Sequence, residues 1–159
     1  MADGKTLVVY YSRKGTTRRV AEEIAAELQC DIEEIVDTKD RSGARGWMGA
    51  ARDARAKNLA VIEDIKHDPS SYDLVVVGTP VWAWTMSAAI RTYLAENKGR
   101  LPEVAFFLTT GGTGMRRTFR QMEELCGKPP VACLGLKARH VRKKDPTKKI
   151  KAFVGRLRG

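Results

Sequence analysis

A short polar turn between an apolar strand pattern and a helical pattern is the clearest candidate for a binding site in this sequence. The turn follows the run Leu7–Tyr11 and leads into a helical repeat of Val20, Ile24 and Leu28. Glycine adopts backbone angles closed to other residues, hydroxyls donate to phosphate oxygens, and a first helical turn presents unpaired N–H groups and a positive dipole end. The turn is therefore predicted to bind a phosphate through Ser12, Lys14, Gly15, Thr16 and Thr17.

Two further loops carry residues that suit a flat, partly apolar ligand. One follows the apolar run Leu74–Gly78 and consists of Thr79, Pro80, Val81, Trp82, Ala83, Trp84 and Thr85. The other follows the run Val104–Thr109 and contains Thr110, Gly111, Gly112 and Thr113. An indole can stack on a planar ring, and small residues let backbone amides approach the edge of that ring. With the phosphate turn, these loops predict a site for a phosphorylated planar heterocycle, and either tryptophan can be the one that stacks.

The pattern of apolar residues predicts alternating strands and helices. Short apolar runs, typical of strands buried on both faces of a parallel sheet, occur at Thr6–Tyr11, Asp31–Val36, Leu74–Gly78, Val104–Thr109 and Val131–Leu136. Helical patterns lie between them, and a last helix is expected with Asp145 as its cap and Pro146 at its first position. This alternation predicts an α/β doubly wound sheet with right-handed crossovers. In such a sheet the loops after the strands converge, so the three candidate loops are expected to meet.

The segment Asp37–Pro69 is the exception to this alternation. It is long, rich in Gly, Asp, Arg and Ala, and contains one helical stretch around Trp47–Asn58. We expect it to form the second crossover, with Trp47 as a packing anchor rather than the wall of a pocket. Whether it also supplies a homodimer contact stays open. A basic, strand-like tail is expected around His140.

Size and composition are those of one globular domain over residues 1–159. The chain is 43% hydrophobic but has no run of about 18 apolar residues, so neither a membrane span nor a secretory leader at Met1–Lys5 is predicted. A cytoplasmic location is the expectation. Cys30, Cys126 and Cys133 have no C-x-x-C spacing and are interpreted as core thiols, not as disulfide partners or zinc ligands.

Charge is unevenly distributed along the chain, whose net charge is +10. Residues 1–97 hold 13 Lys and Arg against 15 Asp and Glu, which gives −2, whereas residues 98–159 hold 16 against 4, which gives +12. A basic half of this kind suits acidic protein partners, anionic lipid or nucleic acid, or is a solvated, solubilising face. Aromatic residues are not interleaved in the basic run Arg139–Lys151, which disfavours nucleic acid as the partner.

Three motifs resemble, in the family's order, those of the flavodoxin-like family of FMN-binding proteins. Val9–Thr17 is similar to the family's phosphate loop, Asp73–Trp82 to its third strand and aromatic loop, and Phe107–Gly112 to its third FMN loop. The resemblance implies a flavodoxin-like three-layer α/β/α fold with a five-stranded parallel sheet of order 2-1-3-4-5. It implies FMN as the cofactor, with the phosphate held by Ser12, Lys14, Gly15, Thr16 and Thr17, the isoalloxazine lined by Thr79 to Trp84, and its pyrimidine edge met by Thr110 to Thr113.

Some residues depart from the family pattern. Lys14 takes the place of a hydroxyl residue and would add a point charge to the phosphate loop. Ala83 and Trp84 occupy the neighbourhood where relatives have a glycine whose peptide can flip, and residues with a Cβ enter positive φ less freely. We therefore expect weaker stabilisation of the one-electron-reduced flavin and a preference for two-electron chemistry. Arg116 and Arg117 are expected to raise the flavin reduction potential.

The predicted function is flavin redox chemistry, in which the protein binds and orients FMN and no side chain acts as catalytic acid, base or metal ligand. Two versions are open: an electron carrier that docks a redox partner protein, acidic given the basic half of the chain, and a reductase that passes hydride from NAD(P)H to a quinone or similar small acceptor. The alternative is a non-enzymatic module that binds nucleic acid or acidic lipid through the basic C-terminal part. Walker, G-x-G-x-x-G, G-x-S-x-G and H-E-x-x-H motifs are absent, which disfavours triphosphatase, dinucleotide-fold, serine hydrolase and zinc protease activities.

Overall fold

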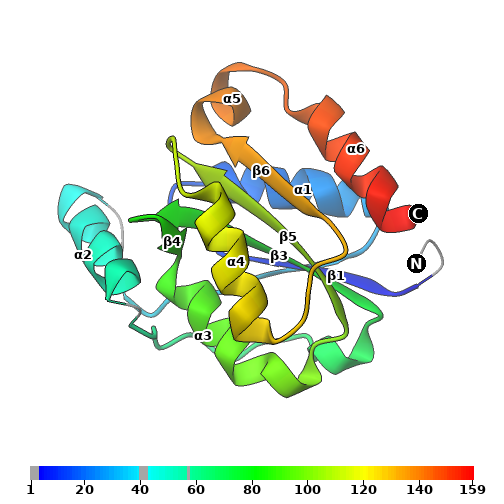
Figure 1. The fold of residues 1–159 in the computed structure, drawn as a ribbon, viewed down its shortest axis with the longest axis horizontal. Helices are drawn as coiled ribbons and strands as arrows, with labels where there is room; N and C mark the ends of the chain where they lie inside the picture. Colours follow the sequence, from blue (N-terminus) through cyan, green and yellow to red (C-terminus); the bar gives the residue numbers. More distant parts are fainter. Residues whose placement is uncertain (1–3, 40–42, 57) are drawn as a thin grey trace.

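Five parallel strands form the centre of the molecule in the computed structural model, which describes residues 4–39, 43–56 and 58–159 (Figure 1). Their order across the sheet is β2-β1-β3-β5-β6, and the short β4 pairs only with β3. Counted without β4, this is the predicted order 2-1-3-4-5, so the predicted α/β fold and strand order are confirmed. The strands are β1 (Thr6–Tyr10), β2 (Asp31–Glu34), β3 (Leu74–Trp82), β4 (Thr85–Met86), β5 (Glu103–Thr110) and β6 (Cys133–Lys137).

Helices cover both faces of the sheet. They are α1 (Thr16–Leu28), α2 (Gly43–Arg55), α3 (Ala88–Asn97), α4 (Met115–Cys126), α5 (Ala138–Lys143) and α6 (Thr147–Arg158), with short 3₁₀ turns η1 (Pro69–Ser71) and η2 (Lys98–Arg100). Successive residues of β1 point to opposite faces, so Val9 packs with α3 and α4 whereas Val8 packs with α1 and α6. Both apolar layers are therefore filled from the same strands, as the continuous apolar runs of the sequence predicted.

The strand after the second crossover is longer than predicted. It continues past Gly78 to Trp82 and then pairs with β4 in an antiparallel hairpin, with Val81 opposite Met86 and Trp82 opposite Thr85. Proline has no N–H to donate and weakens a strand pattern, yet the parallel pairing of β3 with β5 extends to Pro80 opposite Thr109. The predicted loop Thr79–Thr85 is thus a β-hairpin at the carboxyl edge of the sheet.

The C-terminal part differs from its predicted boundaries. β6 begins at Cys133, not at Val131, and His140 lies in helix α5 instead of a strand-like tail. This short helix is held because Val141 is buried and its carbonyl accepts a hydrogen bond from the Arg19 guanidinium. The last helix begins one residue later than predicted, at Thr147, whose N–H donates to the Asp145 carboxylate at 2.9 Å.

The crossover between β2 and β3 contains α2, which begins earlier than predicted and ends at Arg55. Residue 57, within the predicted helical stretch, lies outside the described residues. The segment is fastened to the sheet at its second half, where the buried Glu33 carboxylate accepts from the backbone N–H groups of Lys66 and His67 at 2.6 and 2.9 Å. The crossover therefore places α2 beside the sheet edge where the hairpin lies (Figure 1).

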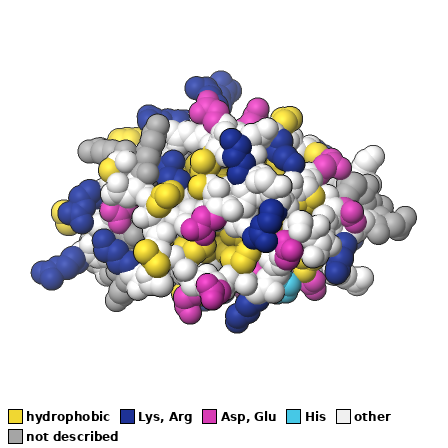
Figure 2. Space-filling view, turned by 90° about the horizontal axis from the view of Figure 1, so that it is seen from below, with side chains coloured by type: hydrophobic (Ala, Val, Ile, Leu, Met, Phe, Trp, Pro, Cys, Tyr) yellow, Lys and Arg dark blue, Asp and Glu magenta, His cyan; other side chains and the backbone are white. Residues whose placement is uncertain are grey.

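Surface charge follows the two halves of the chain. On the α3 side, Figure 2 shows basic and acidic side chains interspersed, as the near balance of residues 1–97 leads one to expect. The last turns of α5 and α6 carry the basic residues His140, Arg142, Lys143, Arg156 and Arg158. The first turns of these two helices contain no acidic residue. None of the helices in the described part of the chain is long and apolar enough to cross a membrane.

Close packing at Gly78 generates a stability prediction. A Cβ on this residue would lie 1.9 Å from the ring tip of the fully buried Phe107, so Gly78→Ala should destabilise the protein by about 3 kcal/mol or more. The control is Gly155→Ala on the exposed side of α6, where a Cβ meets nothing within 4 Å and should stabilise by about 0.5–1 kcal/mol. Urea unfolding measures both. Equal stabilities for the two variants would contradict the packing described here.

Candidate functional site

Three predicted loops follow β1, β3 and β5, which are neighbours in the parallel sheet. Because the carboxyl ends of parallel strands share one edge, the phosphate turn, the hairpin and the glycine loop all lie at that edge (Figure 1). The first and third segments are joined directly, since the hydroxyl oxygens of Thr17 and Thr109 lie 2.8 Å apart in a buried hydrogen bond. The predicted convergence of the strand-end loops is thus present in the fold.

The phosphate turn leaves the first turn of α1 free to bind an anion. Gly15 is the N-cap residue with φ 96°, and its N–H donates to the Ser12 hydroxyl at 2.9 Å. The hydrogen bond from the Arg19 N–H to the Gly15 carbonyl closes the first turn of α1. No side chain caps this turn, and it contains no acidic residue. Its N-terminal amides and dipole therefore suit a phosphate group. Lys14 is exposed beside them, and Thr16 is half-buried.

The hairpin turns through two residues that carry side chains. Ala83 and Trp84 have φ values of 48° and 65°, the left-handed region that costs an L-residue about 1–2 kcal/mol. Residues with a Cβ enter positive φ less freely, and these two are held in it by tertiary contacts. The weaker stabilisation of the one-electron-reduced flavin stays a prediction. The indole N–H of Trp84 donates to the Thr113 hydroxyl at 3.0 Å. At Gly114, a Cβ would lie 3.0 Å from the Trp84 Cα, so this glycine permits the close approach.

A cavity of about 620 Å³ lies beside this hairpin. Seven of the predicted site residues line it: Val81, Ala83, Trp84, Thr110, Gly111, Gly112 and Thr113. Its size is in the range of sites for small molecules and cofactors. The phosphate-turn residues Ser12, Lys14, Gly15, Thr16 and Thr17 do not line it, and neither do Thr79, Pro80 and Trp82. The hairpin and the glycine loop therefore form one wall, and the phosphate turn lies at the same sheet edge outside it.

Three predicted site residues have structural contacts in the fold instead of facing the cavity. Trp82 is only 6% exposed and packs edge-on against Tyr11, with ring centroids 5.3 Å apart. The fully buried Thr79 hydroxyl donates to the Ser87 hydroxyl at 3.2 Å and accepts from the Ser87 N–H at 3.0 Å. The Thr17 hydroxyl is bonded to Thr109, as described above. Of the two tryptophans, Trp84 is the one that reaches the cavity.

The glycine loop is folded by its own threonine. The Thr110 hydroxyl donates to the Thr113 carbonyl at 2.9 Å and accepts from the Gly112 N–H at 3.2 Å. At Gly111 and Gly112 an added Cβ would meet nothing within 4 Å, so the backbone there is open toward the cavity. This arrangement leaves room for the flat edge of a ring to approach the main chain.

Helix α2 forms the opposite wall, which the sequence reasoning did not include. Trp47, Met48, Ala51 and Arg52 line the cavity, and the Trp47 side chain is 53% exposed. The interpretation of Trp47 as a packing anchor is therefore wrong. The available signal was the spacing of these residues at i, i+1, i+4 and i+5 on one helical face, but the direction of that face depends on how the long crossover docks.

The charge that lines the cavity is positive. Arg52 is the charged residue among those that line it, and no acid in the described ranges does so. Arg116 and Arg117 lie in the first turn of α4, which begins at Met115 after the N-cap Gly114. Beneath the hairpin, Arg91 is only 7% exposed, and its guanidinium donates to the Thr85 hydroxyl at 2.9 Å. The Thr85 hydroxyl in turn donates to the Gln121 side-chain oxygen. Burial lowers the pKa of Arg91, and the fold thus fixes a cation under β4.

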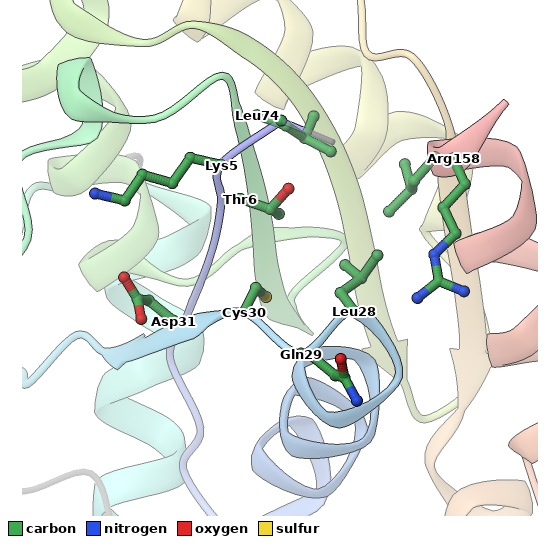
Figure 3. A pocket seen from close by; sticks show the side chains of 10 residues that line it. Lys5, Thr6, Leu28, Gln29, Cys30, Asp31, Leu74 and Arg158 are labelled. Carbon is green, nitrogen blue, oxygen red and sulfur yellow. The ribbon is translucent and has the colours of Figure 1, made fainter. Parts of the chain in front are cut away.

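A second, smaller cavity of about 310 Å³ lies at the opposite edge of the sheet (Figure 3). Lys5, Cys30, Asp31 and Arg158 are among its lining residues. Burial, with the nearby Asp31 carboxylate as a smaller contribution, raises the pKa of the Cys30 thiol to about 11. A thiol with this pKa is a poor nucleophile at neutral pH, so Cys30 does not suit nucleophilic catalysis in this cavity.

Comparison with known proteins agrees with the fold. The sequence model of the Flavodoxin family matches residues 5–146. No curated protein matches this sequence. Among solved structures, the chain is similar to a flavoprotein in complex with FMN from Lactobacillus acidophilus NCFM, at 26% identity and a TM-score of 0.72, over 88% of this chain and 97% of that chain.

Two further structures share the fold at lower identity. A putative flavoprotein from Bacteroides eggerthii DSM 20697 has 22% identity and a TM-score of 0.69, over 95% of this chain and 98% of that chain. A putative quinone reductase from Klebsiella pneumoniae has 10% identity and a TM-score of 0.54, over 98% of this chain and 84% of that chain. At these identities the likeness extends to the fold alone.

The left-handed turn generates a prediction about strain. Ala83→Gly should stabilise the protein by about 0.5–1 kcal/mol, because relief of positive φ at residue 83 exceeds the entropy that glycine adds to the unfolded chain. Ala152→Gly, on the exposed face of α6, is the control and should destabilise by about 0.5–1 kcal/mol. The midpoints of urea unfolding report both values. Destabilisation by Ala83→Gly of the same size as the control would mean that the turn is not strained.

The half-buried thiols of Cys30 and Cys133 generate a second prediction. Burial raises the pKa of Cys133 to about 11, like that of Cys30, so at pH 8 both thiols should react with an aromatic disulfide reagent far more slowly in the folded protein than in urea. A pH series of the reaction rate measures the effect. The rate should rise from pH 8 to pH 10, because both thiols are still mostly protonated in this range when their pKa is about 11 and the reactive thiolate increases with pH. A rate already at its plateau at pH 8 would contradict it.

Proposed function

Because this chain belongs to the flavodoxin family, we propose that it is an FMN-dependent reductase that passes two electrons from NAD(P)H to a small quinone-like acceptor. The observation that carries the proposal is the cavity of about 620 Å³, which lies at the same sheet edge as the phosphate turn and has an indole on each wall. An electron carrier needs only an exposed flavin edge, whereas a reductase needs room for a second small molecule beside the flavin. The hairpin and glycine-loop side of this cavity suits the flavin ring, and the α2 side is where we propose that the second molecule lies.

FMN is the cofactor of this family, and the residues at the sheet edge fit it. The uncapped first turn of α1, with Gly15 in the left-handed region, matches the dianionic phosphate in charge and donor geometry. Trp84 offers an aromatic surface that a hydrogen bond holds in place, and the open backbone at Gly111 and Gly112 suits the polar edge of the ring system. We propose that the other predicted site residues of the three loops also belong to the FMN site: Ser12, Lys14, Thr16, Thr17, Thr79, Pro80, Val81, Trp82, Ala83, Thr110 and Thr113.

Among the described residues that line the cavity there is no carboxylate, thiol or imidazole, so the role we propose for the protein's own residues is to bind and orient the ligands. When bound, FMN supplies the two-electron redox chemistry that side chains lack. In the overall reaction, NAD(P)H loses a hydride, the solvent provides one proton, and the quinone gains both as the two hydroxyl hydrogens of its hydroquinone. Trp84 and the Thr110–Thr113 backbone would fix the ring so that acceptor and donor meet it from the α2 side.

A carrier that docks a redox partner protein is the competing version within the family. Steady-state oxidation of NAD(P)H by purified, FMN-loaded protein discriminates between the two. The proposal predicts that turnover requires a quinone and saturates with its concentration. Reduction that proceeds only with a reductase protein, and never with NAD(P)H, would establish the carrier instead. The three free cysteines fit a reducing compartment, and we propose the cytoplasm.

Phosphate recognition by the α1 turn generates a binding prediction. FMN should bind at least about a hundredfold more tightly than riboflavin, since the phosphate adds several charge-assisted hydrogen bonds. Gly15→Ala should remove most of this preference, because a Cβ is strained at φ 96° although nothing lies within 4 Å of it. Gly99→Ala, equally open and without positive φ, is the matched control. Flavin fluorescence titration measures the affinities. An equal affinity for FMN and riboflavin in the native protein would contradict the phosphate site.

The arginines at the start of α4 generate a prediction about the bound cofactor's midpoint potential. Arg116→Gln and Arg117→Gln should each shift it to more negative values, because a cation favours the more negative, reduced state of a neighbouring group. At about 10 Å in a water-like dielectric the effect is about 0.4 kcal/mol per charge, and it should shrink with added salt. Arg158→Gln, near the opposite sheet edge, is the control. An unchanged potential in the double variant would place these cations too far away to matter.

A further inference from the structure

We propose that α2 selects the electron acceptor, and that the acceptor is a planar aromatic quinone bearing an anionic group such as a sulfonate or carboxylate. The proposal rests on the proposed function, because it names the acceptor class of the same site. The proposal gives a role to α2, which lines the cavity but belongs to none of the three loops predicted to bind FMN.

Helix α2 is docked by one face and open on another. Ala50 is fully buried in the core cluster that also holds Val77 and Ile90, and α2 contacts β3 and β4. The adjoining face supplies Trp47, Met48, Ala51 and Arg52 to the cavity. The helix is therefore anchored through a small residue, while its large side chains stand at the cavity.

Those large side chains are incompletely covered. Trp47 is 53% exposed and Met48 is 67% exposed, and across the cavity Trp84 is 50% exposed. Exposed apolar groups gathered around a cavity mark a ligand site more often than solvated surface. Ala51 is the small residue of the α2 wall. The flavin ring would lie against Trp84 and the glycine loop, and a flat aromatic acceptor would lie on its α2 side against Trp47, where aromatic groups favour stacked contact.

Arg52 gives this apolar cavity its charge preference. Among the residues that the structure describes, its guanidinium has no hydrogen-bond or ion-pair partner. The neighbouring Asp53 does not neutralise it, because that carboxylate is engaged by Lys39 at 3.5 Å and Asn58 at 3.1 Å. The phosphate of FMN does not account for Arg52 either, since the predicted phosphate turn does not line this cavity.

An anionic substituent on the acceptor would satisfy the guanidinium. Arginine binds carboxylate and sulfonate oxygens through two parallel N–H groups and also stacks on aromatic rings. Both properties are available at Arg52, which lies five residues after Trp47, about 1.4 helical turns, on the same wall. A neutral quinone would use the aromatic walls alone and leave the cation without a partner.

The test compares two acceptors on FMN-loaded protein: 1,2-naphthoquinone-4-sulfonate and the neutral 2-methyl-1,4-naphthoquinone. Arg52→Gln should raise the KM of the sulfonate about tenfold or more, because a charge-assisted contact is lost, and leave that of the neutral quinone unchanged. Trp47→Ala should raise both. The control is Arg45→Gln, an exposed arginine on the same helix that does not line the cavity. The oxidised holoprotein and each variant can also be titrated with the sulfonate in the absence of a reductant, with the flavin spectrum as the readout. The dissociation constants should rank the variants in the same order as the KM values of the sulfonate.

Several results would overturn the proposal. Equal changes for both acceptors in Arg52→Gln, or no change in either, would show that the guanidinium does not read an anionic substituent. A change confined to the KM of NADPH would assign Arg52 to the electron donor. Each of these leaves the proposed function standing, because the affinity for FMN and the NAD(P)H–quinone turnover are measured separately. Absence of FMN uptake in the native protein would instead refute the proposed function and this inference together.

Discussion

The contact between Trp84 and the Thr113–Gly114 segment is the constraint on which the rest of the site depends. It joins loops that follow two neighbouring strands, through the indole N–H bond to Thr113 at 3.0 Å and through close packing on Gly114. It also stabilises a turn in which Ala83 and Trp84 both have positive φ, a backbone state that persists only where its surroundings determine it. Without this contact the hairpin and the glycine loop would not form a common wall.

The wall is supported from below by a buried polar network. Arg91 of α3 donates to Thr85, and Thr85 donates to Gln121 of α4, so two helices fix the base of the hairpin. Thr79 adds a third attachment through Ser87. A site that binds a planar cofactor gains affinity from such pre-organisation, because little ordering remains to be done on binding. By contrast, α2 is attached mainly through Ala50 and presents large exposed side chains, which suits a wall that receives exchangeable ligands.

The parts of this structure that follow from local sequence were predicted, and those that follow from tertiary contact were not. Continuous apolar runs predicted the five parallel strands, and the alternation of strands with helices predicted that the loops after them share one edge. The order of the strands across the sheet was implied by the family resemblance. The hairpin was missed because positive φ at Ala83 and Trp84 contradicts the preferences of those residues. Nor could the sequence separate the two tryptophans, since residues i and i+2 of an extended strand face the same way. The turn reverses that relation, so Trp82 lies in the core and Trp84 at the cavity.

Helix α2 illustrates the same division at larger scale. Its existence was expected from composition, but its position follows from distant contacts: Ala50 in the core, and the Glu33 carboxylate that binds the far end of the crossover. The direction of its Trp47 face could not be derived from helical periodicity, which fixes which residues share a face but not what that face meets. The acceptor wall is consequently the part of the site that only the structure shows.

Amide chemical shifts report whether the three loops act together as one FMN site. In a titration of ¹⁵N-labelled protein with FMN, we expect simultaneous, saturable shifts at Gly15, Thr16, Trp84, Gly111 and Gly112, with Lys5, Cys30 and Arg158 at the opposite edge unchanged. Shifts confined to the opposite edge, or shifts in only one of the three loops, would contradict it.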